Sequence, residues 1–246
     1  MNRFFYSAEQ KDGDNVVLIG EDAHHLLRVL RSAVDDQVDL CDAHGVCQRA
    51  VITAVNKNEV ICQLGDVLVA GEAQVKVYLA FGLLKGEKTD LVLQKATELG
   101  VAGFYPFMSQ RTVARPEKKM DNRLQRWDKI IRSAAAQSRR SVIPTVAPPC
   151  SWSQLLTQFS SFRNVILFWE SEVDSALASA LQSCMPGDKI LLITGSEGGL
   201  SVEEALSAKE HGADVVTLGP RILRAETAAI TAVAVSFYQV GEMGGV

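Results

Sequence analysis

The chain has 246 residues, of which 47% are hydrophobic and 22% are charged, a composition ordinary for a folded protein with one or two domains. Its 25 basic and 29 acidic side chains give a net charge of −4, which argues against a uniformly basic nucleic-acid-binding protein. No apolar run reaches the length of a membrane span and the first residues lack the apolar core of a signal peptide, which predicts a cytoplasmic protein with no membrane partner.

The cysteines and histidines give no sign of a metal site or of disulfide bonds. The five cysteines are odd in number and include no Cys-x-x-Cys pair, and the four histidines are scattered. We therefore predict no disulfide, no zinc site and no metal cofactor. The cysteines are Cys41, Cys47, Cys62, Cys150 and Cys184.

Residues 1–72 are expected to form a small β-barrel domain. Short apolar or alternating runs are separated there by turns rich in glycine, asparagine and aspartate. These strands are expected at 16–19, 38–41, 49–55 and 60–64. The exception is 23–31, where three leucines share one helical face and leave Arg28 and Arg31 elsewhere on the surface.

Residues 73–246 are expected to form a second, α/β domain with a parallel sheet, because apolar runs alternate there with helical patterns. Strands are expected at 75–81, 103–107, 165–169, 189–194 and 214–218. Helices are expected at 88–99, 123–138, 174–183, 202–211 and from about 225 to 240.

Two turns of this second domain predict a ligand site. The strand 189–194 ends in Gly-Ser-Glu-Gly-Gly and is followed by a helix with a Ser201/Glu204 capping box, and the strand 214–218 ends in Gly-Pro. Ligands of parallel sheets bind beyond the carboxyl ends of the strands. The glycine pattern matches neither the dinucleotide fingerprint nor the P-loop, and on its own it fits a tight turn without a ligand equally well. The two arginines, the glutamate and the threonine of 218–227 favour a ligand site.

The charge is unevenly distributed. Residues 111–140 contain ten basic and three acidic side chains, so this segment carries +7 and the rest of the chain −11. The basic residues are Arg111, Arg115, Lys118, Lys119, Arg123, Arg126, Lys129, Arg132, Arg139 and Arg140. Such an excess favours a phosphate track over a solvated helix face, and its binding to RNA should weaken with salt. Trp127 in this segment is more typical of core packing than of base stacking.

Several motifs together resemble the ribosomal RNA small subunit methyltransferase E family. The motifs are Gly-Ser-Glu-Gly-Gly-Leu-Ser at 195–201, Leu-Gly-Pro-Arg-Ile-Leu-Arg-Ala-Glu-Thr-Ala at 218–228, Asn-Arg-Phe-Phe at 2–5, His-His-Leu-Leu-Arg-Val-Leu-Arg at 24–31, Gln-Lys-Ala-Thr-Glu-Leu-Gly at 94–100 and Gln-Ser-Arg at 137–139. The family usually has proline where Ser196 stands and often an aromatic residue where Leu200 stands.

The resemblance implies a PUA-like RNA-binding domain followed by a SPOUT methyltransferase domain with a trefoil knot. It also implies a homodimer that uses S-adenosylmethionine to methylate N3 of a uridine in 16S rRNA of the small ribosomal subunit. The cofactor residues it implies are Phe168, Thr194, Gly195, Gly198, Gly199, Leu218, Gly219, Ile222, Leu223 and Thr227. The RNA contacts expected from the resemblance and the charge pattern are Arg3, Arg28, Arg31, Arg111, Arg139 and Arg140.

The chemistry suggests roles for three ionisable residues near the two turns. N3 of uracil carries a proton at neutral pH, so either a base removes it or a cation stabilises the developing anion. We expect Arg224 to stabilise that anion or orient the base, with Glu226 or Glu197 as proton acceptor. Either glutamate could instead hold a loop by accepting backbone N–H bonds.

Three other functions are alternatives to this one. A nicotinamide-dependent oxidoreductase is disfavoured because no strand is followed by Gly-x-Gly-x-x-Gly. A noncatalytic RNA-binding assembly factor would keep the basic segment but would not need two glycine turns. A ribose 2′-O-methyltransferase of the same fold would differ in the atom that it methylates.

Overall fold

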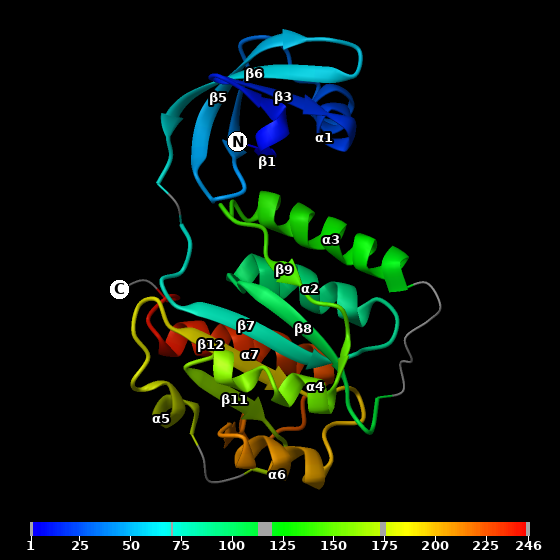
Figure 1. Ribbon diagram of the computed structural model, residues 1–246, viewed down its shortest axis with the longest axis vertical. Coiled ribbons are helices and arrows are strands. Elements are labelled where there is room, and N and C mark those ends of the chain that lie inside the picture. Colours follow the sequence, from blue (N-terminus) through cyan, green and yellow to red (C-terminus); the bar gives the residue numbers. More distant parts are fainter. Residues whose placement is uncertain (1, 70, 113–119, 173–175, 245–246) are drawn as a thin grey trace. The chain divides into compact units, whose positions relative to one another are not determined.

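The computed structural model describes residues 2–69, 71–112, 120–172 and 176–244 (Figure 1). The chain forms two compact units, each with its own sheet. The first unit comprises residues 1–72 and 135–143, and the second comprises 73–134 and 144–246.

The first unit is built on a six-stranded sheet with the order β1-β4-β5-β6-β3-β2. Its elements are β1 (Arg3–Phe5), η1 (Ala8–Gln10), β2 (Lys11–Asp12), β3 (Asn15–Ile19), β4 (Gln37–Cys41), β5 (Cys47–Val55) and β6 (Glu59–Val67). Only β1 and β4 pair in parallel; the other pairs are antiparallel. Alternate side chains such as Val16, Leu18 and Leu40 are fully buried in one core. The edge strands β1 and β2 are not neighbours in this order, so the expected barrel is an open half-barrel.

The helix expected at 23–31 is divided into two parts. It begins as α1 (Gly20–His24) and continues as a π-helical turn, η2 (His25–Val29), closed by a hydrogen bond of 3.0 Å from Leu30 N–H to the carbonyl of His25. The wider turn keeps Leu26 buried, and the chain then leaves the helix at Arg31 with a φ of 54°.

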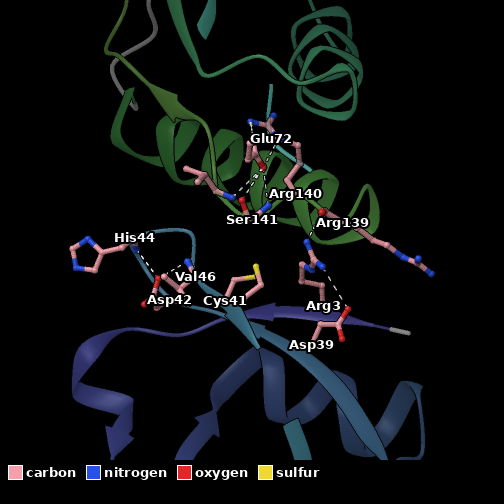
Figure 2. The surroundings of a disulfide bond; sticks show 12 residues. Arg3, Asp39, Cys41, Asp42, His44, Val46, Glu72, Arg139, Arg140 and Ser141 are labelled. Atoms are coloured by element: carbon pink, nitrogen blue, oxygen red, sulfur yellow. Dashed lines mark hydrogen bonds and ion pairs between the residues drawn. A yellow bond between two sulfur atoms is a disulfide. The ribbon is translucent and has the colours of Figure 1, made fainter. Parts of the chain in front are cut away.

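The prediction that the chain has no disulfide was wrong. Cys41 and Cys47 lie opposite one another on β4 and β5 and are bonded through their sulfurs (Figure 2). The turn between them is closed by Asp42, whose carboxylate accepts backbone N–H bonds from His44 at 2.8 Å and Val46 at 2.9 Å. The number and spacing of cysteines carry no information about which residues face each other across a hairpin.

A buried ion pair joins the end of residues 1–72 to residues 140–142 within the first unit (Figure 2). Glu72 accepts hydrogen bonds from Arg140 Nη2 at 2.8 Å and from Ser141 N–H at 2.7 Å, and the Arg140 side chain is only 7% exposed. Burial raises the pKa of Glu72, but the hydrogen bonds and charge of Arg140, together with the N–H groups of Ser141 and Val142, lower it more. The net pKa of Glu72 lies below its ordinary value.

Glu72→Gln should therefore destabilise the protein by about 2 kcal/mol at neutral pH, because Arg140 would keep a buried charge without its carboxylate. The pKa of Glu72 is lower in the folded chain than in the unfolded chain. Its contribution to the free energy of unfolding is therefore present above the ordinary glutamate pKa and is lost as the pH falls through the folded-state pKa. Urea unfolding at pH 7 and pH 3 measures this contribution at the two pH values. Glu59→Gln, whose carboxylate bonds Asn56 at the surface, is the control. An equal loss in both variants, or a loss independent of pH, would contradict the assignment.

The second unit is built on a parallel seven-stranded sheet with the order β10-β8-β7-β12-β11-β13, with β9 also beside β8. The strands are β7 (Lys76–Gly82), β8 (Gly103–Met108), β9 (Thr145–Val146), β10 (Cys150–Ser151), β11 (Asn164–Phe168), β12 (Lys189–Thr194) and β13 (Asp214–Val216). The chain passes from β11 to β12 on one side and then to β13 on the other. The sheet therefore has a topological switch point at β11, where parallel sheets bind ligands.

Helices connect these strands and cover the sheet (Figure 1). They are α2 (Lys88–Leu99), α3 (Met120–Gln137), α4 (Trp152–Leu156), η3 (Phe159–Ser161), α5 (Leu177–Leu181), α6 (Val202–Glu210) and α7 (Ala225–Gln239). The predicted capping box of α6 is present: the hydroxyl of Ser201 accepts from Glu204 N–H, and Glu204 Oε2 accepts from Ser201 N–H at 2.9 Å. Helix α7 packs on α2 and against β7 and β12.

Candidate active site

A cavity of about 810 Å³ lies beyond the carboxyl ends of β11, β12 and β13. Its wall comprises the turns that follow these three strands, the first residues of α7 and one side chain from α2. The lining residues are Lys88, Phe168, Trp169, Glu170, Glu172, residues 194–199, residues 217–225 and Ala228. The two glycine turns predicted from the sequence thus face one space, and the turn after β11 forms its third side.

The first glycine turn, residues 195–199, follows β12 and is tightly packed. Gly199 has a φ of +70°, and a Cβ at this position would lie 2.6 Å from Glu170 Oε1. Glycine adopts this left-handed backbone without strain. The turn after β12 therefore lies directly against the Glu170 side chain, which follows the end of β11.

Ser196 and Leu200 stand where the family that the sequence resembles usually has proline and often has an aromatic residue, and both are buried. The Ser196 hydroxyl lies 3.3 Å from that of Ser109 in the turn after β8, and Leu200 packs in the core of the second unit. Glu197 also holds this turn, since its Oε1 accepts a hydrogen bond from the backbone N–H of Lys85 at 2.9 Å. Contacts with neighbouring segments thus anchor this turn.

The second turn leads from β13 into α7. Gly219 N–H donates to the Thr217 hydroxyl at 3.1 Å, and Gly219 has a φ of +98°. Ile222 is 80% exposed although it lines the cavity, so it offers apolar surface to a ligand. Arg224 is the exposed N-cap residue of α7 and also lines the cavity. An arginine here adds its positive charge to that of the helix N-terminus.

The lysine that begins α2 links the two turns. Lys88 Nζ lies 3.3 Å from Glu226 Oε2 and 3.8 Å from Glu197 Oε1. The hydrogen bond from its own backbone N–H lowers the pKa of Glu226, burial raises it, and Lys88 and Arg224 lower it again, so the net pKa lies below its ordinary value. Glu226 is therefore an ionised, paired carboxylate at a helix N-terminus.

Most predicted cofactor and catalytic residues come together in this cavity. Those that line it are Phe168, Thr194, Gly195, Glu197, Gly198, Gly199, Leu218, Gly219, Ile222, Leu223 and Arg224. Glu226 and Thr227 lie in the first turn of α7 outside the lining, and Thr227 is exposed. Sequence reasoning missed Lys88, since a lysine at the start of an amphipathic helix gives no sign of its distant partners.

One buried polar atom of the cavity has no protein partner within the described ranges. Thr194, the last residue of β12, is 1% exposed, and its hydroxyl makes no hydrogen bond to the part of the chain that the structure describes. A buried hydroxyl without a partner costs free energy unless a ligand or water binds it. The hydroxyl, the glycine backbone and the apolar wall fit a ligand with both polar and apolar parts.

The predicted RNA contacts fall into two groups. Arg28, Arg31, Arg111 and Arg139 are exposed. Arg3 and Arg140 are buried and have structural partners in the first unit. Arg3 Nη2 lies 3.5 Å from Asp39 Oδ2 and its Nη1 donates to the carbonyl of Arg139 (Figure 2), while Arg140 binds Glu72. Arg3 and Arg140 are thus buried and paired within the fold, and their contact with RNA stays a prediction.

The basic segment 111–140 places part of its charge on α3. Arg126, Lys129 and Arg132 are exposed on this helix, whereas the predicted contributors Arg115, Lys118 and Lys119, with the acidic Glu117, lie outside the described residues. Trp127 is 1% exposed and the Arg123 guanidinium lies 4.9 Å from its ring centroid. The prediction that Trp127 packs in the core is confirmed.

The described residues contain neither a membrane-spanning helix nor a cluster of metal-binding side chains. No helix in these ranges is long and apolar enough to cross a bilayer. Likewise, the described histidine, cysteine, aspartate and glutamate side chains form no group of three or more that could hold a metal ion.

Family models define the class of protein to which this fold and site correspond. Residues 71–236 match a family described as an RNA methyltransferase domain, and residues 18–65 match one described as an RNA methyltransferase PUA domain. The first match contains the whole cavity wall. The second lies in the half-barrel and includes α1 and the π-helical turn. The class is that of RNA methyltransferases with a PUA domain.

Individual relatives identify the family within this class. The chain is 33% identical to ribosomal RNA small subunit methyltransferase E of Bacillus subtilis, over 100% of this chain and 99% of the relative. The crystal structure of that enzyme from Neisseria gonorrhoeae, bound to S-adenosylmethionine, superposes with a TM-score of 0.84 at 30% identity over 97% of each chain. A methyltransferase from Legionella pneumophila in complex with the same cofactor gives 0.80 at 31% identity over 96% of each chain. The chain belongs to the ribosomal RNA small subunit methyltransferase E family.

Proposed function

We propose that the protein transfers a methyl group from S-adenosylmethionine to N3 of a uridine in 16S rRNA. The observation that carries this proposal is the cavity at the switch point, where both glycine turns of the family resemblance and Arg224 face one space. Two relatives, 30% and 31% identical, hold S-adenosylmethionine. The cavity volume of about 810 Å³ lies within the range of small-molecule sites.

The residues of the cavity fit this cofactor. Backbone groups of 194–199 and 217–223 are the proposed cofactor contacts, and the unpartnered Thr194 hydroxyl is available to one of its polar groups. Leu218, Ile222 and Leu223 offer apolar surface to its adenine. Glu170 and Glu172 also line the cavity and complement the positive charges of the cofactor.

Catalysis by this chain rests mainly on positioning and charge. The bound cofactor supplies an electrophilic methyl group on a sulfonium, so N3 of uracil must attack without its proton. Arg224 lines the cavity wall, and we assign to it the stabilisation of the uracil anion. Glu226 has a lowered pKa and is therefore a weak base. Glu197 already accepts a backbone N–H, so a loop-holding role suits it better than proton removal.

The half-barrel and the exposed arginines of each unit are the proposed RNA contacts. Arg28, Arg31, Arg111 and Arg139 remain candidates, together with Lys129 and Arg132 on α3. We also expect a homodimer in the cytoplasm, as the family resemblance implies, and the alanine- and valine-rich helix α7 is compatible with a subunit interface. The trefoil knot beyond about residue 195 stays a prediction of the same resemblance.

Removing positive charge from α3 should weaken RNA binding without changing cofactor affinity. Replacing both Lys129 and Arg132 by alanine is expected to raise the Kd for 16S rRNA about tenfold at 0.1 M salt and to reduce the salt slope by about 1 per lost phosphate contact. The matched control is Lys189→Ala with Lys209→Ala, two exposed lysines outside the basic segment. Fluorescence anisotropy over a salt series measures both quantities. Equal slopes for the two double variants would remove α3 from the RNA surface.

The proposed reaction is tested by transfer of labelled methyl from S-adenosylmethionine to RNA. Small ribosomal subunits and free 16S rRNA from a strain lacking the protein are the two substrates, and their comparison shows whether the enzyme needs an assembled subunit. Label recovered as 3-methyluridine from either substrate supports the reaction. Cofactor binding without label would move the target to another RNA. No cofactor binding would favour the noncatalytic assembly factor instead.

A further inference from the structure

Lys88 occupies an unfavourable place in its own helix. It is the first residue of α2, and a cation at a helix N-terminus meets the positive end of the helix dipole. Its side chain is 39% exposed. The helix itself therefore does not favour a lysine at this position. Any stabilisation of its charge must come from the groups around its ammonium.

The ammonium of Lys88 joins carboxylates from two different turns. Glu197 belongs to the glycine turn after β12, and Glu226 belongs to the first turn of α7. Their side chains are 25% and 12% exposed, so both carboxylates are largely withdrawn from water. One cation thus connects the two walls of the cavity, and no other ion pair recorded for the described residues involves Glu226.

The second cation near Glu226 is Arg224, whose charge also acts on that carboxylate. If Lys88 were absent, the largely buried Glu226 would need another cation, and Arg224 is two residues away. A guanidinium paired with Glu226 would be a poorer stabiliser of an anion in the cavity. Lys88 therefore neutralises the carboxylate of Glu226, and the guanidinium of Arg224 remains available to an anion in the cavity.

We propose that Lys88 is a positioning residue of the active site: by pairing with Glu226 it keeps the Arg224 guanidinium free to face the substrate base. Through Glu197 it also fixes the glycine turn relative to α7. The role of Arg224 toward uracil rests on the proposed function. The pairing of Lys88 with Glu226, in contrast, can be measured without any methyl transfer.

The test compares Lys88→Met with Lys88→Arg and with Lys95→Met. Lys95 is the matched control, because it lies on the same helix, is 41% exposed and pairs with a glutamate, Glu98. With cofactor and RNA saturating, Lys88→Met is expected to lower kcat about thirtyfold, less than the loss of a direct donor, while KM for RNA stays within about threefold. Lys88→Arg should recover most of the rate. Lys95→Met should leave the rate unchanged.

A double variant separates this role from simple support of the fold. If Lys88 acts by neutralising Glu226, then Lys88→Met combined with Glu226→Gln should be at least as active as Lys88→Met alone, because Arg224 is released again. A merely structural role would make the two losses add or exceed their sum. Additive losses with wild-type melting temperature would overturn the proposal.

The contact itself is tested by nuclear magnetic resonance of carboxyl-labelled glutamate, which needs no RNA. The pKa of Glu226 should rise in Lys88→Met and stay unchanged in Lys95→Met. An unchanged pKa in both would overturn the proposal whatever the wild-type enzyme methylates. A raised pKa in a protein that methylates no uridine would support the pairing and place the failure in the proposed reaction.

Discussion

Arg224→Ala is expected to lower the single-turnover rate of methyl transfer about 10²- to 10³-fold with cofactor and RNA saturating, the range found for loss of a donor to a developing anion. Arg224 lines the cavity at the start of α7, where its guanidinium and the helix N-terminus both favour negative charge. Raising the pH should partly restore the rate, because more of the uridine N3 is then deprotonated without help. Rapid-quench measurement of the labelled product between pH 7 and pH 9 gives both quantities.

The control for this experiment is Arg221→Ala. Arg221 lies three residues earlier in the same turn, is exposed and also lines the cavity, but it precedes the helix. Its loss should change the single-turnover rate less than about threefold, and both variants should bind the cofactor like the wild type. Near-normal methylation by Arg224→Ala, or an equal loss in Arg221→Ala, would show that the guanidinium at 224 is not the group that stabilises the uracil anion.

Gly82→Ala is expected to abolish measurable cofactor binding. Gly82 ends β7, and a Cβ there would lie 2.4 Å from Ser196 N and 2.9 Å from Gly195 C. Both are backbone atoms of the first glycine turn, so the turn itself would have to move away from β7. Such a forced shift costs about 1–3 kcal/mol of stability. Cofactor affinity should also fall, by at least about a hundredfold, because the moved turn forms one wall of the cavity.

Calorimetry with S-adenosylmethionine and thermal unfolding measure the two effects separately. Gly71→Ala is the control, since a Cβ at this glycine meets no atom within 4 Å. It should leave both affinity and melting temperature unchanged. A Gly82→Ala protein that binds the cofactor within threefold of the wild type would contradict the assignment of residues 195–199 as a cofactor wall.

Elements whose pattern is local were predictable from the sequence. The bounds of α2 (Lys88–Leu99) and β12 (Lys189–Thr194) agree with those expected, because each has a clear hydrophobic pattern and a glycine at its end. The two-residue strands β9 and β10 have no such pattern, since they are too short to show a period. The cavity was predictable because two glycine turns follow two strands of one parallel sheet.

Interactions between distant segments were not predictable in the same way. The Cys41–Cys47 disulfide depends on cross-strand register, and the burial of Arg3 and Arg140 depends on Asp39 and Glu72 lying beside them. Arginine is usually exposed, so a basic motif alone favours a surface contact. Neither pattern nor composition shows which partner a charged side chain meets after folding.

Identification of the methylated nucleoside tests the central claim most directly. Small ribosomal subunits from a strain lacking the protein would be treated with the enzyme and isotopically labelled S-adenosylmethionine, digested to nucleosides and separated by liquid chromatography with mass spectrometry. Label recovered as 3-methyluridine is the predicted result. Label on a 2′-O-methylated nucleoside or on another base would contradict N3 chemistry and, with it, the role of Arg224 in stabilising a uracil anion.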